Sequence, residues 1–119
     1  MDVVNLAEKL TLVPELWSPH IVAELNEMQF KVARVEGDFI WHQHDETDEA
    51  FLVVAGELHI DLPERTVTLG PGELFVVERG VRHRPRSPEG ASIVLIEPRG
   101  VVNTGEEGGD LTAANDRWI

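Results

Sequence analysis

Residues 41–49 read Trp-His-Gln-His-Asp-Glu-Thr-Asp-Glu, and they place two histidines and an acid within a few positions of one another. His42 and His44 are separated by one residue, so both imidazoles lie on the same face of an extended strand. Glu49 opens an apolar run that ends at Ala55, and a turn through residues 45–48 can bring this run back beside the first strand. Two imidazoles and a carboxylate that converge in this way suit a divalent transition metal ion.

The composition limits both the architecture and the ligands. A chain of 119 residues is long enough for one hydrophobic core, so we expect a single domain over residues 1–119. Within it we expect a core barrel at about residues 20–98 and an acidic, glycine-rich tail over residues 99–119. Because the sequence has no cysteine, disulfides and thiolate ligands are excluded, and nitrogen and oxygen must hold any metal.

Charge and hydropathy also limit the partners. The formal net charge is −12, which repels phosphate backbones, so we expect no nucleic-acid partner. No apolar run is long enough to cross a bilayer, and no basic segment followed by an apolar segment resembles a signal peptide. We therefore expect a cytoplasmic protein without a membrane partner.

Most of the chain shows the period-two alternation of half-buried strands, interrupted by glycine and proline turns. Asn5 and Glu8 fit a helix cap, which predicts a short helical turn over residues 6–10. Beyond it we expect about nine short strands, typical of an all-β sandwich or barrel. Their predicted ranges are 20–25, 28–36, 39–44, 49–55, 57–62, 66–69, 73–77, 82–86 and 91–97, with a turn at residues 88–90 between the last two.

A second ordered pattern, Gly72-x5-Glu78-Arg79-Gly80-x2-His83, brackets a predicted strand with glycines and positions one more histidine. Together with Gly37-x4-His42-x-His44-x4-Glu49-x6-Gly56, it resembles the two motifs of the cupin superfamily over residues 28–97. The chain is most similar to small single-domain cupins of the cupin 2 type, often labelled mannose-6-phosphate-isomerase-like. It departs from the family pattern at Glu78, where proline is usual, and at Ser87, where asparagine is common.

The resemblance implies a fold, a ligand set and a range of activities. The fold is a double-stranded β-helix, or jelly-roll barrel. The metal ligands are His42, His44, Glu49 and His83, and Fe, Mn, Ni, Zn and Cu all accept such ligands. We expect a metal-dependent enzyme that acts on a small oxygenated organic substrate by dioxygenase-type or isomerase-type chemistry. The alternative is a non-catalytic protein whose metal supports stability or small-ligand binding.

Several other residues have two possible interpretations. Lys31 shares its strand parity with Ala33 and Val35, so it is a candidate catalytic group if that face is interior; surface exposure is the alternative. His59 is expected to be exposed to solvent, and His20 to be structural. Phe51 is expected to line the pocket because it has the parity of Glu49.

The aromatic residues near the chain ends suggest contacts outside one small barrel. Trp17 and Trp41, with apolar strands near the N-terminus, offer more hydrophobic surface than one barrel face needs. We therefore expect a homodimer. The tail ends in Trp118-Ile119, which can attach it to the body.

Overall fold

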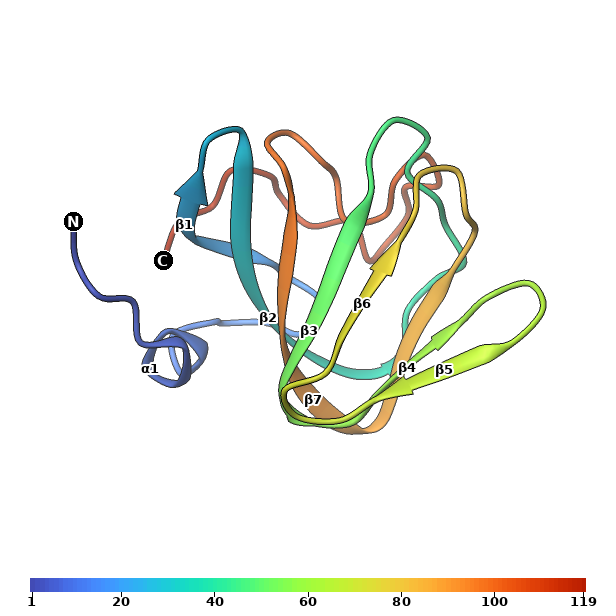
Figure 1. Ribbon diagram of the computed structural model, residues 1–119, viewed down its shortest axis with the longest axis horizontal. Coiled ribbons are helices and arrows are strands. Elements are labelled where there is room, and N and C mark those ends of the chain that lie inside the picture. Colours follow the sequence, from blue (N-terminus) through green and yellow to red (C-terminus); the bar gives the residue numbers. More distant parts are fainter.

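The computed structural model describes residues 1–119 and shows an antiparallel β barrel preceded by one short helix (Figure 1). The main path of the 7-stranded sheet is β1-β2-β7-β3-β6, and the short β4–β5 hairpin joins it through β4 and β7. The elements are α1 (Leu6–Leu10), β1 (His20–Leu25), β2 (Met28–Asp38), β3 (Glu49–Gly56), β4 (Leu58–Asp61), β5 (Thr66–Leu69), β6 (Leu74–Val77) and β7 (Arg84–Pro98). The fold is the expected jelly-roll barrel with a short N-terminal helix.

The predicted helical turn is α1, whose bounds match the expectation. The Glu8 amide donates to the side-chain oxygen of Asn5 over 3.0 Å, which satisfies one of the free amides at the helix start. Leu10 then packs with Val32 and Val94 on the outer face of β2 and β7. This contact holds the N-terminal segment against the barrel. At five residues, α1 is far too short to cross a bilayer, and no other helix is present.

The barrel interior is built from alternate residues of β2, β3 and β7. Lys31, Ala33 and Val35 lie on one face of β2, as the strand parity predicted, and that face points inward. Only 3% of Lys31 is exposed, so the alternative that placed it on the surface is wrong. Phe51 from β3 and Leu95 from β7 pack beside this row. The apolar core thus forms the wall against which the polar residues are positioned.

The last two predicted strands are one long strand, β7, and the turn expected at residues 88–90 does not reverse the chain. The first part of β7 pairs with β4, whereas the last part pairs with β3, and β2 runs alongside both parts. The strand bends between them at Gly90, whose φ is +96°, a value that glycine adopts without strain. Ser87 is buried just before the bend and donates to the Glu57 carbonyl over 2.6 Å.

Residues 39–44 are extended but do not form the predicted strand. They have only an isolated bridge, His42 with His83. On either side of the bridge there is a single backbone hydrogen bond, from the Phe39 amide to the Pro85 carbonyl and from the Gly80 amide to the His44 carbonyl (each 2.9 Å), and no continuous ladder forms. The count of seven strands instead of about nine follows from this segment and from the continuity of β7.

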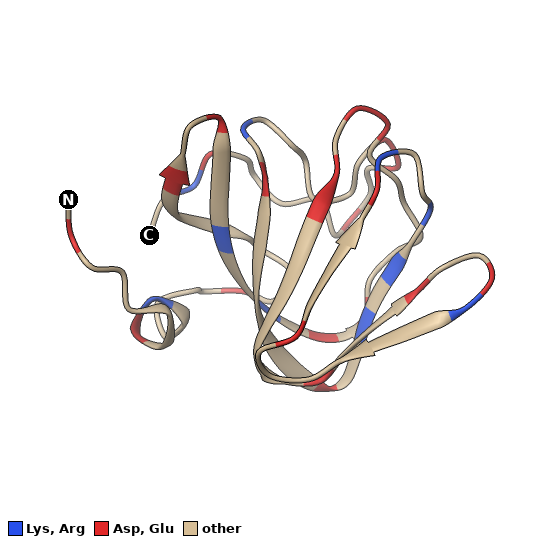
Figure 2. Ribbon diagram, viewed as in Figure 1, with Lys and Arg blue, Asp and Glu red and all other residues tan.

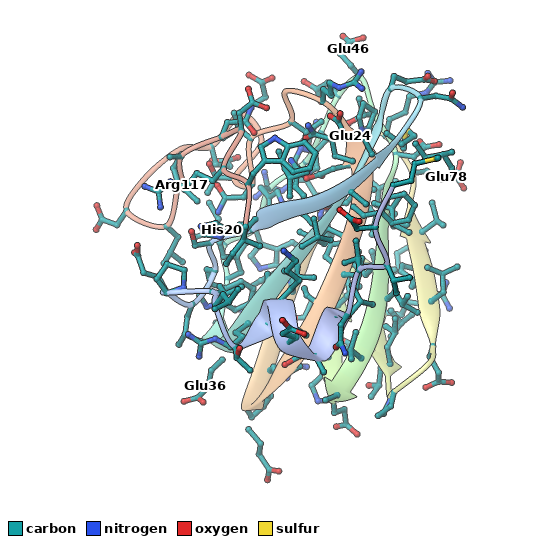
Figure 3. All side chains as sticks on the ribbon, turned by 90° about the vertical axis from the view of Figure 1, so that its left-hand side faces the viewer. His20, Glu24, Glu36, Glu46, Glu78 and Arg117 are labelled. Atoms are coloured by element: carbon teal, nitrogen blue, oxygen red, sulfur yellow. The ribbon has the colours of Figure 1, made fainter.

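The C-terminal tail runs back along the barrel and brings the two chain ends to the same side (Figure 1). Its last residues pair with β1: Ile21 donates to the Arg117 carbonyl (2.7 Å), and the Ile119 amide donates to the Ile21 carbonyl (3.1 Å). Figure 3 shows Arg117 on the tail beside His20, whereas Glu36 and Glu46 extend outward.

Acidic residues gather in the loops rather than in the middle of the strands (Figure 2).

Candidate metal centre

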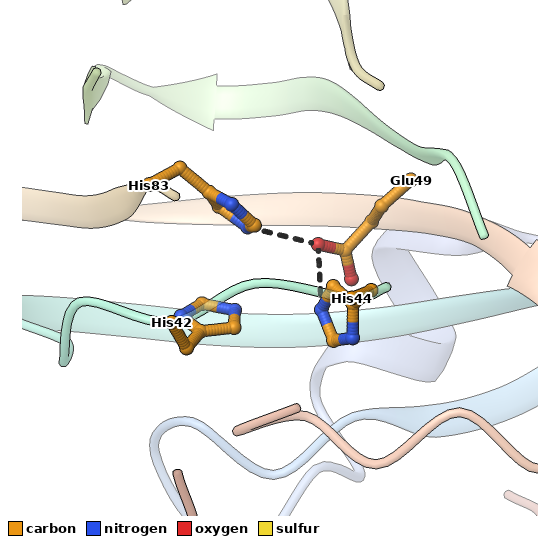
Figure 4. Close-up of side chains that lie close together, drawn as sticks. All are labelled: His42, His44, Glu49 and His83. Atoms are coloured by element: carbon orange, nitrogen blue, oxygen red, sulfur yellow. Dashed lines mark ion pairs between the residues drawn. The ribbon is translucent and has the colours of Figure 1, made fainter. Parts of the chain in front are cut away.

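Four side chains meet inside the barrel, and they are the four that the sequence selected (Figure 4). One ligand atom from each of His42, His44, Glu49 and His83 lies within 4.8 Å of the other three, and all four residues are buried. His42 and His44 come from the segment between β2 and β3. Glu49 is the first residue of β3, and His83 directly precedes β7. This group could hold one metal ion.

Backbone pairing fixes the three histidines relative to one another. The His42 amide donates to the His83 carbonyl (3.0 Å), and the His83 amide donates back to the His42 carbonyl (2.9 Å). The His44 carbonyl accepts from the amide of Gly80 (2.9 Å). Asp48 holds the same loop because its carboxylate accepts from the Arg79 amide over 2.8 Å. Backbone hydrogen bonds therefore join the two sequence motifs at the site.

Two of the imidazoles have their tautomer set by the backbone. Nδ1 of His42 donates to the Ile40 carbonyl and Nδ1 of His83 to the Val81 carbonyl, each over 2.9 Å. Because a carbonyl oxygen can only accept, each Nδ1 carries the hydrogen. In the neutral form of each ring the opposite nitrogen, Nε2, carries no hydrogen and is available to a metal.

The polar atoms at the centre lack partners. Nε2 of His44, Nε2 of His83 and Oε1 of Glu49 are buried without a hydrogen bond. Each of the two nitrogens lies 3.4 Å from the Glu49 oxygen (Figure 4), a contact that is an ion pair only when the imidazole is protonated and that does not have the geometry of a hydrogen bond. Such unpartnered buried groups are rare and costly, and a cation among them would satisfy all three. The residues present therefore fit a transition metal ion.

The protonation states also suit a metal. Burial and, to a smaller extent, the neighbouring His83 together lower the pKa of His42 to about 4. Burial alone raises the pKa of Glu49, but the contacts with His44 and His83 outweigh it and bring that pKa well below its usual value. At neutral pH His42 is therefore neutral and Glu49 is ionised, as metal binding requires.

A second buried ionic group lies beside the ligands, and sequence reasoning found only half of it. Nζ of Lys31 donates to Glu97 over 2.9 Å, and both side chains are almost completely buried. Burial and the negative charge of Glu49 raise the pKa of Glu97. Glu97 has the inward parity of Ile93 and Leu95, which is the signal that could have identified it. The ammonium of Lys31 is thus already paired, and its catalytic role stays a prediction.

A small cavity of about 30 Å³ adjoins the centre and reaches His42 and Glu49. Its other walls include Trp17, Phe39, Phe51, Ile93, Leu95 and Asn103. Phe51 therefore lines the pocket, as its parity predicted. Trp17 lies outside every motif, and only the tertiary structure brings it to the site.

The two remaining histidines lie outside this group. His20 is buried, and its Nδ1 donates to the Ser18 carbonyl over 2.8 Å, which confirms its structural role. His59 lies on the outer side of β4, 2.8 Å from the hydroxyl of Thr68 and 3.1 Å from the carboxylate of Glu57. These contacts leave its side chain 20% exposed, so His59 is half-buried on the outer side of the barrel rather than open to solvent as predicted.

Comparison with known proteins agrees with this geometry. The chain is 32% identical over 84 residues to the uncharacterized protein YdbB of Bacillus subtilis (strain 168), covering 70% of this chain and 74% of that protein. A crystal structure of a cupin-2 domain containing protein from Shewanella frigidimarina is 44% identical, with a TM-score of 0.80, over 82% of this chain and 95% of the other.

Protein NMB1881 from Neisseria meningitidis is 36% identical, with a TM-score of 0.75, over 82% of this chain and 99% of the other. Residues 28–97, which span both glycine-bracketed motifs and all four candidate ligands, match the model of the cupin domain. The chain belongs to the cupin domain family.

Proposed function

We propose that His42, His44, Glu49 and His83 bind one divalent transition metal ion, and that the protein is a metal-dependent enzyme for a small oxygenated organic substrate. The observation that supports this best is the set of three buried, unpartnered donor atoms beside a cavity. A closed structural metal site needs no space next to the ion, whereas a catalytic site keeps a position open. Fe, Mn, Ni, Zn and Cu all fit the donor set.

The bound ion would supply a Lewis acid for oxygen donors or a site for dioxygen. The protein's own residues determine what reaches it. His42 and Glu49 are the two candidate ligands that line the cavity, so a substrate oxygen would lie next to them. Phe51 and Leu95 exclude water from the same space, which strengthens electrostatic interactions there.

The lining favours dioxygenase-type over isomerase-type chemistry. An isomerase must move a proton between substrate atoms, which requires a titratable group in the cavity besides the metal ligands. The polar side chain there other than the ligands is that of Asn103, which does not titrate. Lys31 is paired with Glu97 and lines a different hollow, beneath the tail. Oxygen chemistry at the metal needs no such separate base.

The test combines metal analysis with an oxygen-uptake screen. We expect about one metal ion per purified wild-type chain, and oxygen consumption by the iron-loaded protein with some members of a panel of dicarbonyl and enediol compounds. His83→Ala should lose both, whereas the matched control His59→Ala should keep both. Stoichiometric metal without any turnover would favour the non-catalytic alternative, and a chain that binds no metal would refute the site.

We also propose that the protein forms a homodimer through the outer face of β3 and β6. Leu74 and Val76 are exposed on edge strand β6, and they pair in register with Leu52 and Ala50 on β3. An exposed apolar edge of this kind is a usual place for subunits to meet. Light scattering should give twice the chain mass of 13.3 kDa. Leu74→Glu should shift the protein to monomer, and a wild-type monomer at tens of micromolar would contradict the proposal.

A further inference from the structure

The cavity beside the metal centre has almost no capacity for hydrogen bonding. Apart from His42 and Glu49, its one polar side chain is Asn103. The Asn103 amide nitrogen already donates to the carbonyls of Trp17 (3.1 Å) and Leu111 (2.9 Å), and its oxygen accepts from the Ala113 amide (2.9 Å). Beyond the metal ligands, a substrate in this cavity would therefore meet mainly apolar side chains.

This lining argues against polyhydroxylated and phosphorylated substrates. Each hydroxyl moved from water into the cavity without a partner costs free energy, and a phosphate would need a cation that is not already paired. The nearest buried cation is Lys31, which is engaged by Glu97. A sugar phosphate is therefore the wrong chemical class for this space.

Trp17 closes the cavity. Its ring stacks on Phe39 with centroids 4.7 Å apart, and Phe39 in turn lies edge-on to His42 at 5.3 Å. With Trp17 in this position the cavity of about 30 Å³ has room for little more than a water or two. Any larger ligand must displace the indole or fit against it.

The attachment of Trp17 suits such a role. The residue lies outside the regular strands, in a segment between Pro14 and Pro19. Its φ is +58°, a left-handed conformation that is strained for a residue with a Cβ. Strained backbone of this kind is concentrated at ligand clamps and switch regions. Its indole nitrogen is held by a single bond, to the Glu36 carbonyl at 3.0 Å.

We propose that the substrate binds the metal through one or two oxygen atoms and places an uncharged, apolar body in this cavity, and that Trp17 sets the size of that body. The inference rests on the proposed metal site and narrows its substrate class. Trp17 acts as a specificity-determining wall, because its position limits how far the body can extend from the metal.

The test uses cobalt-loaded protein and a series of hydroxamic acids. All of them share one metal-chelating group, so differences in their affinity report on the part of the molecule that lies in the cavity. Binding is followed by the change in the visible absorption of the cobalt ion, which requires no turnover. We expect wild-type protein to bind propionohydroxamate at least about tenfold more tightly than 2,3-dihydroxypropionohydroxamate, because the two added hydroxyls find no partners.

Replacing Trp17 tests the size limit. Trp17→Ala should bind benzohydroxamate at least about tenfold more tightly than wild type, while affinity for acetohydroxamate should change little. Trp17→Leu provides a second variant should the alanine protein fail to fold, and Trp41→Ala is a control for a tryptophan that does not line the cavity.

The outcomes separate this inference from the proposed metal site. Cobalt bound at one ion per chain, with equal or tighter binding of the dihydroxylated probe, would overturn the apolar substrate class and leave the metal site intact. Unchanged benzohydroxamate affinity in both Trp17 variants would overturn the role of Trp17. Failure to bind cobalt would refute the metal site and this inference with it.

Discussion

His83→Ala protein is expected to have the same melting temperature with metal as after chelator treatment, whereas the wild-type protein should melt at a higher temperature with metal. A ligand that binds only the folded state stabilises it by RT ln(1 + [L]/Kd), about 2.7 kcal/mol at a hundredfold excess over Kd. For a chain of this size that corresponds to roughly 10 °C. His83 contributes one of the buried, unpartnered nitrogens, so its loss should remove the binding energy. Differential scanning calorimetry measures both samples.

The same temperature difference should depend on pH. Imidazole binds a metal only when neutral, and its pKa in the unfolded chain is about 6.5. Burial lowers the pKa of His42 in the fold to about 4. Because this folded-state pKa is depressed, the unfolded chain binds more protons between these values. The stability is then present above pH 6.5 and lost as pH falls towards 4. This loss is common to the metal-loaded and the metal-free protein, so it cancels in their difference. The difference should be full at pH 7.5 and shrink at lower pH because protons then compete with the metal for the imidazoles.

His59→Ala is the matched control, because it removes a histidine that lies outside the ligand group. At every pH it should show the same difference in melting temperature between metal-loaded and chelator-treated samples as the wild type. A difference that persists in His83→Ala, or that stays constant from pH 7.5 to 4 while the metal remains bound, would mean that these histidines do not hold the ion.

Lys31→Met should be the most destabilising single change in the polar interior. Lys31 and Glu97 are 3% and 1% exposed, and their charged atoms lie 2.9 Å apart. Removing Lys31 leaves the Glu97 carboxyl buried without its cation, so Glu97 must stay ionised at a cost or take up a proton. Breaking a buried pair in this way costs roughly 3–5 kcal/mol of unfolding free energy. Urea denaturation of metal-free protein, with and without the substitution, measures this loss.

The double variant Lys31→Met/Glu97→Gln separates the charge from the packing. Because it removes both charges and nearly preserves the volume, it should recover most of the stability lost in Lys31→Met. Arg82→Met tests an exposed pair, Arg82 with Glu107, and should change stability little. A double variant as unstable as the sum of its two single variants would mean that the pair is not coupled.

Part of the fold and most of the candidate centre could be predicted because they depend on local periodicity. Alternation placed Lys31 on the same face of β2 as Ala33 and Val35, and Phe51 on the same face of β3 as Glu49. The structure shows that both faces are interior. The turn signal at residues 88–90 was misleading because Gly90 lies within a bend of β7, where the strand changes partners. Whether such a residue reverses or bends a strand depends on neighbours distant in the sequence.

By itself, the sequence determined the identity of the four candidate ligands and the strand parity of the inner face, because residue type and a period of two are properties of the local chain. Only the tertiary structure decided that Glu97 neutralises Lys31, and that Trp17 closes the cavity over His42. These contacts join residues far apart in the chain, and they depend on how β2 and β7 pair and on where the N-terminal segment crosses the barrel. The local sequence pattern does not predict where the N-terminal segment crosses the barrel. Burial and packing of the whole chain select that position among many compact alternatives.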